Sequence, residues 1–171
     1  MHFKRFLDIK PEISNLFIIF INNKVLYDLN DKTFLLNSSF LNFTSFEFKK
    51  IGIAQDNNIN IYAADLSNEP FNVSNQGYQS LVEYDLRYLM TILSEKDLGL
   101  LGRANQLLHY LNSTKHCGYC GSVMEFDSTE EAMFCKCNNL MIYPKISPCV
   151  LALIKKDNQI LLARNAIFPE G

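Results

Sequence analysis

The sequence predicts an α+β protein, in which a small, mostly antiparallel β domain with helices precedes a zinc ribbon and a β-hairpin. Three observations predict it. Short apolar stretches divided by asparagines fill residues 14–66, the apolar spacing becomes helical from Leu81, and four of the five cysteines lie within the 21 residues from Cys117 to Cys137. The expected divisions are a β-rich domain ending in two helices over 1–112, the ribbon over 113–147 and the hairpin over 148–171.

The first third of the chain carries two hairpin patterns. Asn15–Ile21 is a candidate for a buried strand, Asn22 and Asn23 form a two-residue turn, and Lys24–Tyr27 is the return strand. Ile51–Gln55 and Ile59–Ala63 repeat this scheme across another asparagine-rich turn. Asparagine suits these turns because it tolerates the left-handed backbone conformation. A small, mostly antiparallel sheet is therefore expected.

Two helices are expected after the sheet. From Leu81 onward the spacing is helical, and the first helix places on one face Leu86, Leu89, Met90 and Leu93. Ser94, with Asp97 three positions on, is typical of the N-cap of a second helix. Gly99 and Gly102 each cost this second helix about 1 kcal/mol relative to alanine, which a close approach of its backbone to the sheet would explain.

The cysteines predict one structural Zn²⁺ bound by Cys117, Cys120, Cys135 and Cys137, because two short clusters can each supply two thiolates to a tetrahedral ion. Cys117-x-x-Cys120 followed by glycine is typical of a metal knuckle. The second pair is spaced Cys-x-Cys, one residue short of the usual lower limit. A redox Cys-x-x-Cys, disulfides, and His116 in place of Cys137 are the alternatives. Cys149 is expected in the core, because it lies in an apolar run of strand character.

Composition limits the class of function. A formal net charge of −2 argues against unspecific binding of nucleic acid, and no apolar run is long enough to cross a bilayer. The opening residues, Met1–Arg5, lead into no apolar signal-peptide core, so we expect a cytoplasmic protein with reduced cysteines. With 171 residues and 48% hydrophobic content, the chain can bury a core.

Several motifs around the cysteines point to one family. They are Cys-Gly-Tyr-Cys-Gly at 117–121, the fifteen residues from Cys120 to Cys135, and Tyr-Pro-Lys-Ile-Ser-Pro-Cys at 143–149 leading into Val-Leu-Ala-Leu-Ile. Together they resemble the NAD(H) pyrophosphatases of the Nudix superfamily. Leu100–Leu108 resembles the helix of that family, and Leu161–Arg164 resembles its first Nudix hairpin.

The chain departs from the family at two places. The fourth cysteine of the family aligns with Asn138, and this chain has Cys137 instead, so Asn138 and His116 are both alternatives to Cys137 as the fourth ligand. The Nudix box, Gly-x5-Glu-x7-Arg-Glu-x2-Glu-Glu-x-Gly, holds the catalytic Mg²⁺ in the family and is absent, because the chain stops at Gly171. The resemblance therefore implies the opening hairpin of a truncated Nudix domain.

The resemblance implies a hydrolase that releases nicotinamide mononucleotide and AMP from NADH or NAD, using Mg²⁺ or Mn²⁺ held by the missing carboxylates. It also implies a homodimer and places three residues at the substrate, Tyr143, Glu130 and Arg87. Nucleic acid is otherwise not an expected partner of this hydrolase, with an NAD-capped RNA end as the exception. We expect this chain alone to be inactive. The alternative is a stand-alone zinc-ribbon module that binds a nucleotide, RNA or a protein partner.

Overall fold

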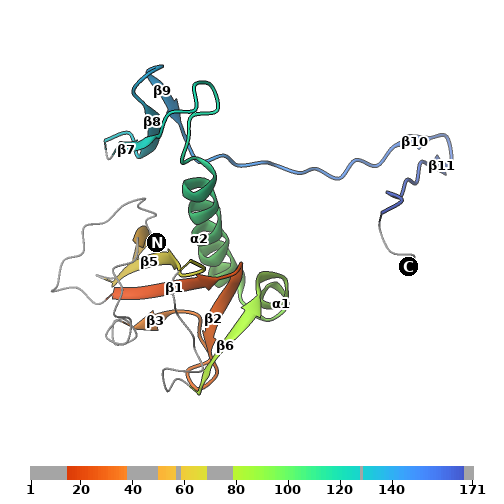
Figure 1. Cartoon of the computed structure of the whole chain (residues 1–171). Helices are drawn as coiled ribbons and strands as arrows, with labels where there is room; N and C mark the ends of the chain where they lie inside the picture. The colour runs from red at the N-terminus through yellow and green to blue at the C-terminus, as the bar shows by residue number, and fades with distance from the viewer. Residues whose placement is uncertain (1–14, 38–49, 57–58, 69–78, 128, 168–171) are drawn as a thin grey trace.

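The structure, a computed structural model, describes residues 15–37, 50–56, 59–68, 79–127 and 129–167, with only the backbone for 50–56. Two helices and eleven short strands form in these residues (Figure 1). In chain order the elements are β1 Asn15–Ile21, β2 Lys24–Asp28, β3 Leu36–Asn37, β4 Lys50–Asp56, β5 Ile59–Asp65, β6 Leu81–Asp85, α1 Leu86–Ile92, α2 Glu95–Ser113, β7 Glu125–Asp127, β8 Ala132–Cys135, β9 Leu140–Ile142, β10 Lys155–Lys156 and β11 Gln159–Ile160.

The main sheet has six strands in the order β4-β5-β1-β2-β6, with β3 also paired to β1. The pairing of β1 with β5 is parallel, while the other described pairings in this sheet are antiparallel. This confirms a mostly antiparallel sheet.

Both predicted hairpins are present in this sheet. β1 and β2 are joined by Asn22 and Asn23, whose φ angles of 49° and 64° give the left-handed pair that a two-residue hairpin turn requires. β4 and β5 pair antiparallel with a register shift between Gly52 and Ala54. Their predicted turn residues Asn57 and Asn58 lie outside the described residues.

The helical reading of the segment from Leu81 is wrong for its first five residues. Leu81–Asp85 form β6, which pairs antiparallel with the whole of β2, from Lys24 opposite Asp85 to Asp28 opposite Leu81. Pairing with a strand distant in sequence outweighs the local apolar spacing here. The predicted face of α1 also holds only in part, because Leu89 is fully buried while Met90 is 60% exposed.

α2 begins where the sequence predicts. The Ser94 Oγ accepts a hydrogen bond from the Asp97 N–H at 3.2 Å, which caps the helix. The expected close approach at Gly99 and Gly102 is wrong, because nothing lies within 4 Å of a Cβ added at either position. Within the described residues, neither helix is long and apolar enough to cross a membrane.

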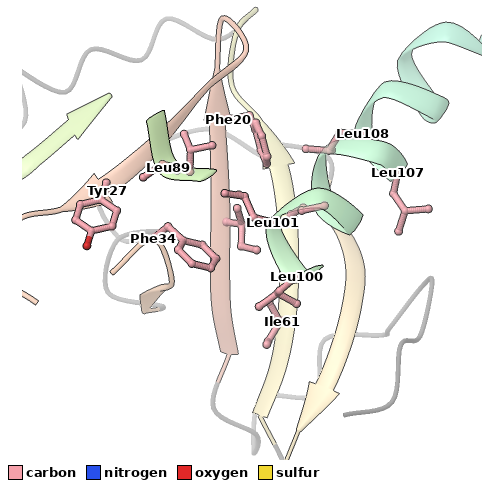
Figure 2. Close-up of a cluster of buried hydrophobic side chains, with 13 residues drawn as sticks. Phe20, Tyr27, Phe34, Ile61, Leu89, Leu100, Leu101, Leu107 and Leu108 are labelled. Atoms are coloured by element: carbon pink, nitrogen blue, oxygen red, sulfur yellow. The ribbon is translucent and has the colours of Figure 1, made fainter. Parts of the chain in front are cut away.

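β1 carries buried side chains on both faces of the main sheet. On one face, side chains of β1 and of neighbouring segments pack beneath α1 and α2. Figure 2 shows Phe20 of β1, with Phe34 and Ile61, facing Leu101 and its neighbours. The opposite face holds a second cluster that includes Phe17, Ile19 and Tyr62, with the Phe17 and Tyr62 rings stacked at 5.6 Å. A strand buried on both faces explains the unbroken apolar run in its sequence.

The ribbon is a separate three-stranded antiparallel sheet, β7-β8-β9, beyond the C-terminal end of α2 (Figure 1). Its own small core contains Tyr110, Cys117, Met124, Met133 and Cys135. Tyr110 belongs to α2, so this helix packs on the main sheet along most of its length and on the ribbon at its end. The predicted domain boundaries remain predictions.

The segment after the ribbon runs away from the rest of the chain (Figure 1). Its hairpin is shorter than predicted, because β10 and β11 pair over two residues each and the turn is Asp157 and Asn158. Cys149 is exposed, so its predicted place in the core is wrong. Several apolar side chains here are more than half exposed: Ile146, Val150, Leu151, Leu153, Ile154, Ile160, Leu161, Leu162 and Ile167.

Candidate metal centre

The first half of the centre is a tight knuckle at Cys117–Gly121. The Gly121 N–H donates to the Cys117 carbonyl at 2.8 Å, and the Cys117 N–H donates to the Ser122 carbonyl at 2.8 Å. Gly121 has a φ of +74°, which only glycine adopts at low cost. The glycine after the second cysteine is thus required by the backbone turn that brings Cys117 and Cys120 together.

Three of the four predicted cysteines meet at this knuckle. The sulfurs of Cys117, Cys120 and Cys135 all lie within 4.8 Å of one another, and those of Cys120 and Cys135 are 3.5 Å apart. Two thiolates on one tetrahedral Zn²⁺ lie about 3.8 Å apart, because each metal–sulfur bond is about 2.3 Å. The three sulfurs therefore fit one metal ion of this kind.

Cys135 is the most deeply placed of the three, at the end of β8 and fully buried. A hydrogen bond with the Ser122 hydroxyl, 3.3 Å from its sulfur, is the main cause that lowers the pKa of Cys135 from 9.0 to about 6. Burial opposes this shift, while the Asn138 backbone and the other two thiols add to it. Cys135 is therefore a thiolate at neutral pH, the form that binds a metal.

The fourth predicted ligand is not in the group. Cys137 is exposed and lies outside the cluster of three sulfurs. Asn138 is there instead, with its Nδ2 3.7 Å from the Cys117 sulfur and 3.8 Å from the Cys135 sulfur. The turn after β8, with Asn139 at a φ of 51°, returns the chain so that position 138 faces the cluster. His116 is exposed and also lies outside the group.

The position of the centre is held by Tyr110 from the last turn of α2. Its hydroxyl donates to the Ile142 carbonyl of β9 and accepts the Met133 N–H of β8 at 2.7 Å. Tyr110 is buried in the same cluster as Cys117 and Cys135. One side chain of α2 thus fixes two strands of the ribbon.

The structure brings together two of the three predicted substrate residues. The Tyr143 hydroxyl donates to the Glu130 Oε2 at 3.0 Å, and the Tyr143 side chain is about half exposed directly after β9. Arg87 is exposed on α1, next to the N-terminal end of α2. From Glu95 to Tyr110 the helix rises about 23 Å, so α1, the helix that carries Arg87, lies at the opposite end of α2 from the ribbon (Figure 1).

Sequence reasoning missed Ser122 and Tyr110. Ser122 has a usable signal, because a hydroxyl two residues after a ligand cysteine can reach that sulfur; the Ser122 Oγ is 2.9 Å from the Cys120 sulfur. Tyr110 has none, because its partners at Met133 and Ile142 are distant in sequence.

Comparison with known proteins adds to this geometry. No family model matches the chain. One relative is the "NAD-capped RNA hydrolase NudC" of Escherichia coli O157:H7, 39% identical over 91 residues, which is 52% of this chain and 35% of the relative. The chain resembles the NAD-capped RNA hydrolases. The protein of the same name from Shigella boydii serotype 18 is 44% identical over 72 residues, 42% of this chain and 28% of the relative. The match thus spans about a third of the length of these curated relatives.

Proposed function

We propose that this chain is the N-terminal and zinc-ribbon portion of a hydrolase that cleaves the pyrophosphate bond of NAD(H) or of an NAD-capped RNA end. The products from NADH or NAD are nicotinamide mononucleotide and AMP. The observation that carries the proposal is the similarity to the NAD-capped RNA hydrolases over about half of the chain. The cysteine cluster supports it, because Cys117, Cys120 and Cys135 belong to the motifs that resemble the NAD(H) pyrophosphatases, and their sulfurs lie together in the structure.

Tyr143 is the proposed contact with a base of the dinucleotide. Its ring is about half exposed, its hydroxyl is held by Glu130, and Pro144 restricts the backbone that follows. A ring fixed in this way loses little conformational freedom when a base stacks on it, and such stacking is worth about 1–3 kcal/mol. Glu130 therefore acts as a positioning residue.

We propose that Arg87 joins this contact from a second copy of the chain, because α1, which carries Arg87, lies at the end of α2 away from the ribbon. The proposed homodimer would supply that second copy. The Arg guanidinium suits a pyrophosphate, since its planar fork donates paired hydrogen bonds.

The cysteine centre is proposed to hold a structural Zn²⁺, which would cross-link the knuckle to the end of β8. The reaction itself needs a second kind of site, in which carboxylates hold Mg²⁺ or Mn²⁺. Among the described residues, the one metal-ligating group with three or more members is the cysteine cluster. We therefore propose that these 171 residues bind the substrate and do not hydrolyse it.

Titration of the zinc-loaded chain with NADH and with a short NAD-capped RNA tests the proposal. Tyr143→Ala should weaken binding roughly five- to 150-fold, which corresponds to the loss of about 1–3 kcal/mol of stacking. Tyr119→Ala is the matched control, because Tyr119 is in the same ribbon and 85% exposed. Equal binding by the two variants, or no preference for the NAD end over the same RNA with a plain 5′ phosphate, would contradict the proposed site.

The inactivity is tested separately. The pure chain with Mg²⁺ or Mn²⁺ should release no AMP from NADH. Release that is abolished by a chelator and persists through further purification would contradict this. Binding of RNA or nucleotides with no preference for NAD, and without hydrolysis, is the result that the alternative binding module predicts.

A further inference from the structure

The sequence leaves open which residue is the fourth ligand of the metal centre. Three cysteine sulfurs form the rest of the centre, and the Asn138 side chain lies against two of them, those of Cys117 and Cys135. We infer that the centre is a three-thiolate metal site completed by the side-chain amide oxygen of Asn138, and that Cys137 takes no part in it.

The distances support this assignment. An oxygen ligand and a sulfur ligand on the same tetrahedral Zn²⁺ lie about 3.5 Å apart, from bonds of about 2.0 Å and 2.3 Å. The terminal amide atom of Asn138 is 3.7 Å and 3.8 Å from two sulfurs of the centre. It therefore lies at ligand-to-ligand distance from two of the three sulfurs.

The chemistry of the amide group explains which of its atoms faces the sulfurs in each state. With the sulfurs alone, the Nδ2 donates hydrogen bonds to them, and this is the arrangement seen. An amide nitrogen offers no lone pair to a cation, whereas the amide oxygen does. A half turn about the last side-chain bond exchanges the two atoms and leaves the rest of the residue in place.

The backbone selects position 138 over position 137. Cys135 and Asn138 are spaced three apart, as are Cys117 and Cys120, so both halves of the centre have the x-x spacing of a metal knuckle. Cys137 is exposed on the turn between Cys135 and Asn138. Replacement of a thiolate by a neutral amide leaves a zinc centre with one negative charge where four thiolates would give two.

The test is the ligand set of the zinc- and cobalt-loaded chain, measured by X-ray absorption and by the intensity of the thiolate-to-cobalt charge-transfer bands. The expected shell has three sulfurs at about 2.3 Å and one oxygen at about 2.0–2.1 Å. Cys137→Ser should leave both spectra unchanged. Asn138→Cys should convert the shell to four sulfurs and raise the charge-transfer intensity by about one third.

Affinity separates the Asn138 oxygen from a water molecule in the same position. In competition with a chelator, Asn138→Ala should bind zinc at least about tenfold more weakly than the unaltered chain. Unchanged affinity in Asn138→Ala, a four-sulfur shell in the unaltered chain, or the loss of one sulfur in Cys137→Ser would each overturn the assignment. None of these measurements depends on binding or hydrolysis of NAD, so the inference can fail independently of the proposed function.

Discussion

Replacing Tyr110 with phenylalanine removes one oxygen atom and keeps the ring in the ribbon core. That oxygen joins α2 to two strands, through the Met133 N–H of β8 and the Ile142 carbonyl of β9. The ring itself packs among Cys117, Met133 and Cys135, and this packing is retained in the variant. The effect of Tyr110→Phe therefore measures the two hydrogen bonds.

The magnitude follows from the burial of the two partners. The Met133 N–H is buried, and a buried donor left without a partner costs about 1–3 kcal/mol. The Ile142 carbonyl is partly buried, so water can replace the hydroxyl and only the net value of one bond, about 0.5–1.5 kcal/mol, is lost. Tyr110→Phe should therefore lower the free energy of unfolding of the ribbon by roughly 2–4 kcal/mol.

Urea denaturation and amide exchange at Met133 measure this loss, with and without bound zinc. The matched control is Tyr119→Phe, because Tyr119 is a largely exposed ribbon tyrosine and should stay within about 0.5 kcal/mol of the unaltered chain. If Tyr110→Phe behaves like this control and the exchange of Met133 is unchanged, the hydroxyl does not join helix and ribbon, and the reasoning is refuted.

Four further substitutions, one of them studied as a function of pH, are measured by denaturant unfolding of the same chain. Gly102→Ala should stabilise α2 by about 0.5–1 kcal/mol, because the added Cβ meets nothing within 4 Å. Gly121→Ala should instead destabilise the ribbon by about 1–2 kcal/mol, because the φ of Gly121 is +74°. Effects of the same sign in the two variants would contradict this reasoning. Ser94→Ala should lower the free energy of unfolding by about 1 kcal/mol, because the hydrogen bond from the Asp97 N–H is lost. An unchanged free energy of unfolding would contradict the capping role of Ser94. In the metal-free chain, the pKa of Cys135 is about 6 when folded against 9.0 ordinarily, so its stabilising contribution is complete above pH 9 and is lost as the pH falls through 6. The unfolding free energy should thus rise from pH 6 to 9, and less so in Cys135→Ser; equal slopes would contradict the lowered pKa.

The elements that the sequence predicts well are those set by neighbouring residues. Asn22 and Asn23 specify a tight hairpin by themselves, and Ser94 caps α2 through a residue three positions away. Leu81–Asp85 could not be assigned in this way, because its strand exists through pairing with β2, more than fifty residues earlier. The parallel pairing of β1 with β5 is equally non-local.

The candidate site shows the same division. The knuckle at Cys117–Gly121 follows from its spacing and its glycine, and the structure places it as expected. The choice between Cys137 and Asn138 depends on how the turn after β8 closes, which is set by Asn139 in a left-handed conformation. A count of cysteines cannot reveal that turn.

The parallel pairing of β1 with β5 has a consequence for synthesis on the ribosome. Asn15 pairs with Asn60 and Phe20 with Asp65, so each β1 residue is made 45 residues before its partner. At 5–20 residues per second, this separation corresponds to roughly 2–9 s. During that time β2 and β3 can already pair with β1, while the edge of β1 that binds β5, a strand apolar at every position after Asn15, is without its native partner. A neighbouring nascent chain that presents the same strand could pair with that edge before β5 emerges.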